Sequence, residues 1–221
     1  MLHTSQEGGA ALRPVGRVTE VSVGALFLLS TATFASGGAL LASYFEAGPA
    51  GKGRFLVIGA ALQMTCGLAV AAIGWLLYRV LKSTTPKRAA GYLVARVVEC
   101  VVIIACSVWL IVTKVPVPEY DLLIYGFTGL GGLLLTSALF TTRLVPRWLA
   151  VLGLFGYAVF LAALPVDLVG VGELDATLGA ALIPGGLFEI ALPLLLILHG
   201  FIHHPYTPKS EARQVHTPAN G

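Results

Sequence analysis

Charged side chains are scarce in this chain. Asp, Glu, Lys and Arg make up only 11% of its 221 residues, whereas about a quarter of the residues of a typical soluble domain are charged. Hydrophobic residues make up 57%, and the mean hydropathy is +0.86. A soluble fold could not bury that much apolar surface, so the composition excludes a soluble globular protein and predicts a polytopic membrane protein.

Signatures of catalysis, cofactor binding and metal binding are lacking as well. The apolar runs contain no serine, histidine and acid set, no zinc motif, no phosphate-binding loop and no paired aspartates. The three cysteines have no CxxC spacing, and His203 and His204 have no acidic or cysteine partner at ligand spacing. No Lys/Arg-rich patch is interleaved with aromatics. We therefore expect no enzyme activity, metal, cofactor or nucleic-acid partner.

Long apolar runs are what the sequence does have. A spanning helix takes roughly 20 residues, and the runs are continuous and rich in Leu, Ala and Gly instead of alternating as strands would. The sequence predicts an all-α integral membrane bundle of six transmembrane helices, over about 18–45, 55–81, 89–113, 122–142, 148–166 and 177–201. Segment 1–16 is expected to be cytoplasmic, 17–204 to form the membrane domain, and 205–221 to be a disordered cytoplasmic tail.

Basic residues lie mainly on one side of the predicted bundle. That side holds Arg13, Arg17, Arg79, Lys82, Lys87, Arg88, Arg143, Arg147, Lys209 and Arg213, and the other side holds Lys52, Arg54 and Lys114. Loops rich in Lys and Arg stay in the cytoplasm. The asymmetry predicts that both termini are cytoplasmic, which an even number of crossings requires.

Three ionisable residues interrupt the apolar runs far from their ends. Counted from the predicted cytoplasmic boundary near Arg88 at 1.5 Å per residue, Arg96 and Glu99 lie roughly 12 and 16 Å deep, and Glu189 lies near the middle of the sixth run. A charge at the bilayer centre costs at least about 2.5 kcal/mol, and such residues usually face protein or a wet cavity. These three residues are therefore the best functional clue in the sequence.

Helical spacing gives this cluster two further candidates. Tyr92 shares a face of the third run with Arg96 and Glu99 at about 100° per residue. Gln63 is the one amide on a face of small residues in the second run, where a buried amide needs partners. The predicted binding residues are Arg96, Glu99, Glu189, Gln63 and Tyr92.

The charges of the cluster leave two interpretations open. One guanidinium and two carboxylates sum to minus one if all are ionised, so one carboxyl is either protonated or balanced by a bound cation or by further donors. In the structural interpretation, Arg96 and Glu99 neutralise each other and protonated Glu189 ties the sixth helix to the third. In the functional one, the three residues form a site for a substrate or an ion.

Three segments carry a resemblance to a known family. They are GYLVARVVECVVI (91–103), RLVPRWLAVLGLFG (143–156) and PGGLFEIALPLLLILHGF (184–201). They resemble the bacterial domain-of-unknown-function family 4386, and the likeness covers roughly 17–201. The resemblance implies a multi-pass protein of the bacterial inner membrane and supplies no activity or substrate.

Three functions are compatible with these observations. The first is a carrier or binding protein for a small polar or amphipathic molecule, with proton linkage. The second is a non-enzymatic scaffold or subunit in which the cluster only locks helices together, and the third is an intramembrane enzyme acting on lipid. The bilayer is the one partner the sequence identifies, and the oligomeric state is left open.

Overall fold

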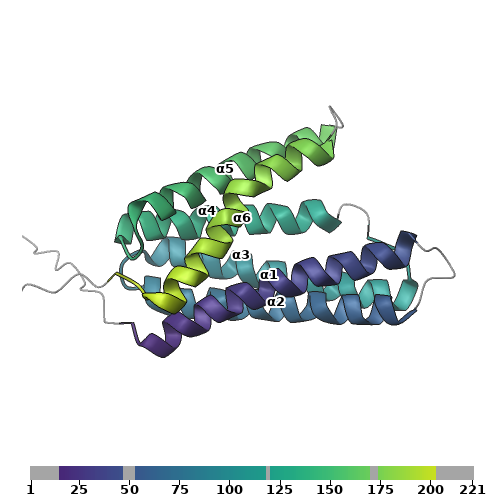
Figure 1. Ribbon diagram of the computed structural model, residues 1–221, viewed down its shortest axis with the longest axis horizontal. Coiled ribbons are helices and arrows are strands. Elements are labelled where there is room, and N and C mark those ends of the chain that lie inside the picture. The colour runs from purple at the N-terminus through teal and green to yellow at the C-terminus, as the bar shows by residue number, and fades with distance from the viewer. Residues whose placement is uncertain (1–14, 47–52, 118–119, 170–173, 203–221) are drawn as a thin grey trace, which may run out of the picture.

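All regular secondary structure is α-helical in the residues that the computed structural model describes, which are 15–46, 53–117, 120–169 and 174–202 (Figure 1). This part of the chain contains no β-strand, and the predicted all-α class with six helices is confirmed. The helices are α1 (Arg17–Glu46), α2 (Gly53–Leu81), α3 (Pro86–Thr113), α4 (Tyr120–Thr142), α5 (Arg147–Val169) and α6 (Leu174–Leu198).

All helix ends lie within three residues of the predicted bounds. The last helix ends at Leu198, so the predicted end at 201 is wrong, because Gly200 adopts a left-handed φ of 78° that terminates the helix. The third begins at Pro86, earlier than predicted, since proline fits the first helical position, whose N–H needs no partner within the helix. Residues 1–14 of the predicted N-terminal segment, His203, His204 and the predicted tail 205–221 lie outside the described residues.

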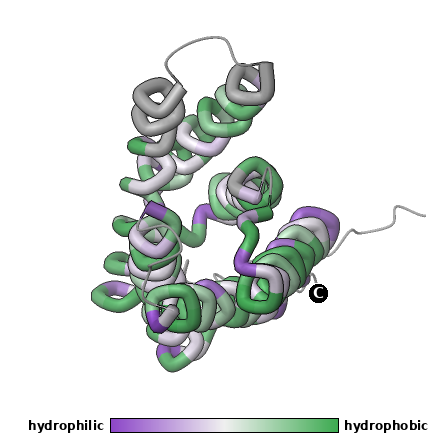
Figure 2. Tube along the Cα trace, turned by 90° about the vertical axis from the view of Figure 1, so that its right-hand side faces the viewer, coloured by the Kyte–Doolittle hydropathy of each residue, from purple (hydrophilic) through white to green (hydrophobic). Residues whose placement is uncertain are grey.

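The six helices form a closed ring. Each of α1 to α5 packs against the helix that follows it, and α1 also packs against α6. Figure 2 looks along the helices and shows them arranged around the middle of the bundle. In Figure 1, α1 starts and α6 ends on the left, which we call the termini end; α1, α3 and α5 end, and α2, α4 and α6 start, at the opposite, far end.

The outer surface of this ring is apolar. Val94, Trp109 and Phe155 are each more than half exposed, and five helices are long and apolar enough to cross a membrane. The described part of α6 adds a shorter apolar helix, Ile183–Leu198. A surface of this kind is stable in lipid, so the chain is a multi-helix membrane protein.

The core is concentrated at the termini end. One large cluster of fully or nearly fully buried side chains fills that half, and it includes Ile73, Leu77, Leu81, Leu139, Leu149 and Leu196. The cluster of the other half is small and consists of Cys66, Val70, Ile103 and Ile124. Packing is therefore dense next to the termini and sparse beyond them.

Polar contacts close the ring at the termini end. The N–H of Phe201 donates to Oε1 of buried Glu20 at 2.9 Å, and Arg17 donates to the carbonyl of Leu196 at 2.9 Å. The close approach of α1 and α6 requires Gly24, where a Cβ would lie 2.8 Å from the carbonyl oxygen of Pro193. These contacts, which we call the clasp, hold the start of α1 against the end of α6.

Candidate functional site

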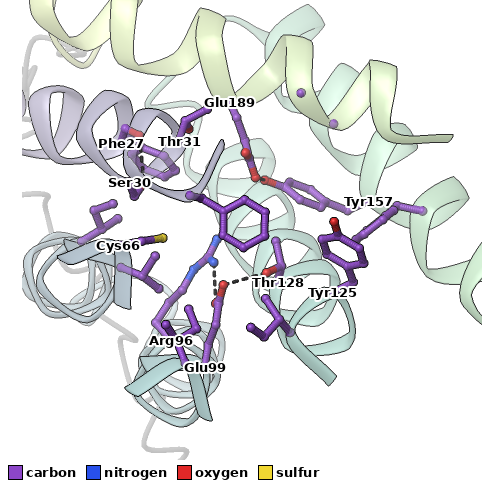
Figure 3. A pocket seen from close by; sticks show the side chains of 18 residues that line it. Phe27, Ser30, Thr31, Cys66, Arg96, Glu99, Tyr125, Thr128, Tyr157 and Glu189 are labelled. Carbon is purple, nitrogen blue, oxygen red and sulfur yellow. Dashed lines mark hydrogen bonds and ion pairs between the residues drawn. The ribbon is translucent and has the colours of Figure 1, made fainter. Parts of the chain in front are cut away.

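A cavity of about 250 Å³ lies in the middle of the ring. Residues from each of the six described helices line it, among them Phe27, Cys66, Arg96, Tyr125, Tyr157 and Glu189 (Figure 3). Most of the wall is aromatic or aliphatic, and the polar groups are few. Small-molecule sites are typically concave, mostly apolar and fitted with a few oriented polar groups, so this cavity has the composition of a binding site.

Arg96 and Glu99 form an ion pair in the wall of this cavity. Nη1 of Arg96 lies 2.7 Å from Oε2 of Glu99, and both residues are only 4% exposed. The i, i+3 spacing on α3 places the two side chains side by side. The other oxygen of Glu99 accepts a hydrogen bond of 2.7 Å from the hydroxyl of Thr128 on α4. The charge of Arg96 is thus compensated within α3, and Glu99 connects α3 to α4.

Gly74 on α2 makes room for the Arg96 side chain, because a Cβ there would lie 2.8 Å from Cβ of Arg96. Gly131 on α4 faces the same side chain, and a Cβ there would be in ordinary contact, 3.6 Å from Nε of Arg96. Within the described residues this Nε is buried and has no hydrogen-bond partner. The guanidinium carbon lies 5.2 Å from the centre of the Tyr92 ring, within cation–π distance. Arg96 therefore reaches the cavity between α2 and α4, with Tyr92 next to it on the termini side.

Glu189 approaches the cavity from the opposite wall. It lies on α6 and accepts a hydrogen bond of 2.8 Å from the hydroxyl of Tyr157 on α5. In the part of the chain that the structure describes, the ion pairs are Arg17–Glu20 and Arg96–Glu99, so Glu189 takes part in neither. Figure 3 shows Glu189 and the pair from α3 pointing into the cavity from different sides. The second carboxylate therefore faces the cavity with only a neutral partner.

The predicted site residues do not all line this cavity. Arg96, Glu99 and Glu189 do, whereas Tyr92 and Gln63 do not. Tyr92 is one helical turn nearer the termini end and belongs to the dense core. Its hydroxyl has no hydrogen-bond partner among the described residues. Tyr92 therefore contacts Arg96 from the dense core and does not line the cavity.

Gln63 lines a second cavity of about 400 Å³ at the far end, between α1, α2, α3 and the start of α4. Its Nε2 makes a long hydrogen bond of 3.4 Å to the carbonyl of Phe34, and its buried Oε1 has no partner in the described residues. Phe34 and Tyr125 line both cavities, and their ring centres are 6.4 Å apart. These two rings separate the far-end cavity from the central one.

Sequence reasoning missed Thr128, Tyr157 and the aromatic pair Phe34 and Tyr125. Tyr157 had a usable signal, because a tyrosine in mid-span needs a partner for its hydroxyl when it is buried. Threonine in a membrane helix usually bonds to its own backbone, so nothing in the sequence distinguishes Thr128 from its neighbours. No group of three His, Cys, Asp or Glu side chains in the described residues could hold a metal ion.

The sequence model of the family described as "Domain of unknown function (DUF4386)" matches residues 22–117 and 119–200. The matched ranges contain Arg96, Glu99, Thr128, Tyr157 and Glu189. No curated protein and no solved structure matches the chain.

Proposed function

Because this chain belongs to the DUF4386 family, whose description names no activity, we propose its function from the cavity itself. It is a membrane-embedded binding protein or carrier for a small polar or amphipathic molecule, and Glu189 couples binding to a proton. The chain acts without covalent chemistry, in the cell inner membrane, with both termini in the cytoplasm.

One observation carries this proposal. Three ionisable side chains from α3 and α6 line one cavity in the middle of the membrane domain, and Glu189 stands outside the ion pair made by the other two. Ionisable residues at this depth are costly and mark substrate, ion or proton pathways. A purely structural role for Glu189 would instead place it against a cation or several donors, and its partner among the described residues is the hydroxyl of Tyr157.

The arrangement suggests a division of roles. The pair of Arg96 and Glu99, with Thr128, is internally satisfied and fixes the shape of one wall. Glu189 is the group that can gain or lose a proton without breaking an ion pair. If the basic loops of the termini end are cytoplasmic, the far-end cavity opens toward the other side of the membrane and offers a route to the central one.

The proposal is tested with full-length protein in lipid nanodiscs. Three small aromatic compounds of similar size serve as probes: benzyltrimethylammonium (cationic), N,N-dimethylbenzamide (neutral) and benzenesulfonate (anionic). We expect at least one to bind to wild-type protein with an affinity that changes with pH, and Glu189→Gln to remove that pH dependence.

Glu46→Gln is the matched control, because it makes the same substitution at an exposed carboxylate at the end of α1. It should leave binding and its pH dependence intact. Binding by none of the three probes, or the same pH dependence in wild-type and Glu189→Gln protein, would overturn the proposal.

The scaffold function is the second candidate, and one observation favours it. The hydrogen bonds from Arg96 and Thr128 to the two oxygens of Glu99 connect α3 with α4, so this part of the cluster holds two helices together in either function. Glu189 takes no part in these hydrogen bonds. If the scaffold is the whole function, Glu189→Gln will be harmless in the cell while Arg96→Ala is not.

A further inference from the structure

We infer that the ligand of the central cavity is a small monovalent organic cation with an apolar body, which binds to ionised Glu189 in exchange for a proton. This inference rests on the proposed binding function and specifies the ligand. It follows from the charges, the wall and the size of the cavity.

The charges favour a cation over an anion. An anionic ligand would need the positive charge of Arg96, but Glu99 lies 2.7 Å from that guanidinium and shares its burial. Replacing this contact would strand the Glu99 carboxylate in a dry environment, which is strongly unfavourable. With the pair neutral overall, ionised Glu189 gives the cavity a net charge of minus one. The complementary ligand carries one positive charge.

The wall of the cavity favours an organic cation over a hydrated metal ion. The rings of Phe34, Tyr125 and Phe160 line it one after another. The ring centres of Phe34 and Tyr125 are 6.4 Å apart, and those of Tyr125 and Phe160 are 5.4 Å apart. The negative faces of aromatic rings attract alkylammonium groups, and the attraction is stronger when the groups are desolvated. A metal ion would need several oxygen ligands at short range, and the described residues contain no such cluster of acids and histidines. The rings also provide apolar contact for the body of the ligand.

The volume limits the size of the ligand. At about 250 Å³, the cavity lies below the roughly 300–1,000 Å³ of sites for drug-sized molecules. A single ring with an ammonium head is of suitable size. The ligand reaches the cavity from the far end, past buried Gln63 and then between Phe34 and Tyr125.

Proton exchange follows from the surroundings of Glu189. The titratable groups that line the cavity with it are Tyr157 from α5, Tyr125 from α4, Arg96 and Glu99 from α3, and Cys66 from α2; α1 contributes Phe27, Ser30, Thr31 and Phe34, which do not titrate. Arg96 is the one cation in this set, and Glu99 is its partner. An empty cavity therefore keeps Glu189 neutral with a proton. When the cation enters, the O–H bond of the carboxyl breaks, the proton leaves to solvent, and the carboxylate pairs with the ammonium.

The experiment measures binding of tritiated benzyltrimethylammonium to full-length protein in nanodiscs, with the neutral N,N-dimethylbenzamide and anionic benzenesulfonate as competitors. We expect the cation to bind at least tenfold more tightly than either competitor. Its affinity should rise by about tenfold per pH unit while Glu189 is protonated in the unliganded protein, because one proton is displaced. Glu189→Gln should weaken the cation at least tenfold and abolish the pH dependence.

Two further variants keep the test decisive if Glu189→Gln misfolds. Glu189→Asp retains the charge and should preserve the preference for the cation, while Tyr125→Leu removes one ring and should weaken the cation more than the neutral amide. Glu46→Gln again serves as the control and should bind like wild type.

The possible failures are distinguishable. If benzenesulfonate or the amide binds most tightly and Glu189→Gln abolishes its pH dependence, the ligand class is wrong and the proposed binding function stands. If none of the three compounds binds, both are wrong. Tight cation binding that is unchanged in Glu189→Gln would also overturn the inference.

Discussion

The two halves of the bundle are built differently. Next to the termini, large side chains such as Leu77, Leu139 and Leu196 fill the space between the helices almost completely. In the far half, the buried cluster is small and two cavities of about 250 and 400 Å³ lie between the helices. The boundary between the halves runs through α3, where Tyr92 belongs to the dense side and Arg96 to the hollow side.

This difference separates stability from function along the membrane normal. A dense, clasped end gives the ring its rigidity, and the hollow end is then available for a ligand. Functional sites are often the least stable part of a fold, because they keep polar groups and voids that packing would remove. Substitutions on the two sides of Arg96 should therefore have unequal effects.

The largest effect is expected at the boundary itself. Arg96→Ala leaves the buried Glu99 carboxylate without its cation, which typically costs about 3–5 kcal/mol. The melting temperature in detergent should fall sharply. Arg79→Ala, at an exposed arginine near the end of α2, is the control and should melt like wild type. A stable Arg96→Ala protein would show that the pair contributes little to the fold.

A pair of matched truncations compares the halves directly. Leu135→Ala removes side-chain atoms from the dense core, and burial of this kind is worth about 2–5 kcal/mol. Ile124 is equally buried but lines the central cavity, so Ile124→Ala enlarges an existing void and should cost clearly less. Denaturation of both variants in the same detergent measures the difference. Equal losses would contradict the division into dense and hollow halves.

The clasp at the termini end should contribute less than the core. Glu20→Ala leaves the N–H of Phe201 without its carboxylate acceptor, at a cost of about 1–3 kcal/mol. Hydrogen exchange should then increase at the end of α6 and not at the far end of α1. Exchange that rises evenly over the bundle would mean that the clasp supports the whole fold instead of one contact.

The smallest effect concerns access to the central cavity. In a Cys100→Ala, Cys106→Ala background, Cys66 is the remaining thiol, and it lines the central cavity. Phe34→Ala removes one of the two rings that separate this cavity from the far one. N-ethylmaleimide should then modify Cys66 a few-fold faster, while the melting temperature changes little. An unchanged rate would place the entrance elsewhere.

Hydropathy and helical spacing suffice for much of this picture. The six helices follow from the long apolar runs, and Arg96, Glu99 and Glu189 stand out because charge is rare within them. Their placement around one cavity depends on how the helices are rotated and staggered, which a single sequence does not encode locally. Gln63 illustrates the limit: it was predicted to belong to the site with Arg96, but it lies about one turn closer to the far end than Cys66 and lines the other cavity.

The partners of the ionisable residues were beyond sequence reasoning for the same reason. Glu189 was expected to meet α3, yet it accepts a hydrogen bond from Tyr157 on α5. Glu99 pairs with Arg96, as the structural interpretation expected, and the hydroxyl of Thr128 on α4 is a second partner that the sequence did not indicate. Each hydroxyl reaches its carboxylate because small residues allow close helix contact; at Gly156 on α5, for example, a Cβ would lie 2.5 Å from the backbone nitrogen of Gly185 on α6.

The contact between α1 and α6 has a consequence for how the protein is made. The ribosome releases α1 long before α6, so Gly24 and Glu20 must wait for their neighbours while the four helices between them enter the membrane. During that interval the surface of α1 around Gly24 has no α6 to contact, and Glu20 can pair with Arg17 within α1 but not with the N–H of Phe201. Insertion of the sixth helix is therefore the step that completes the ring and brings the N–H of Phe201 to Glu20.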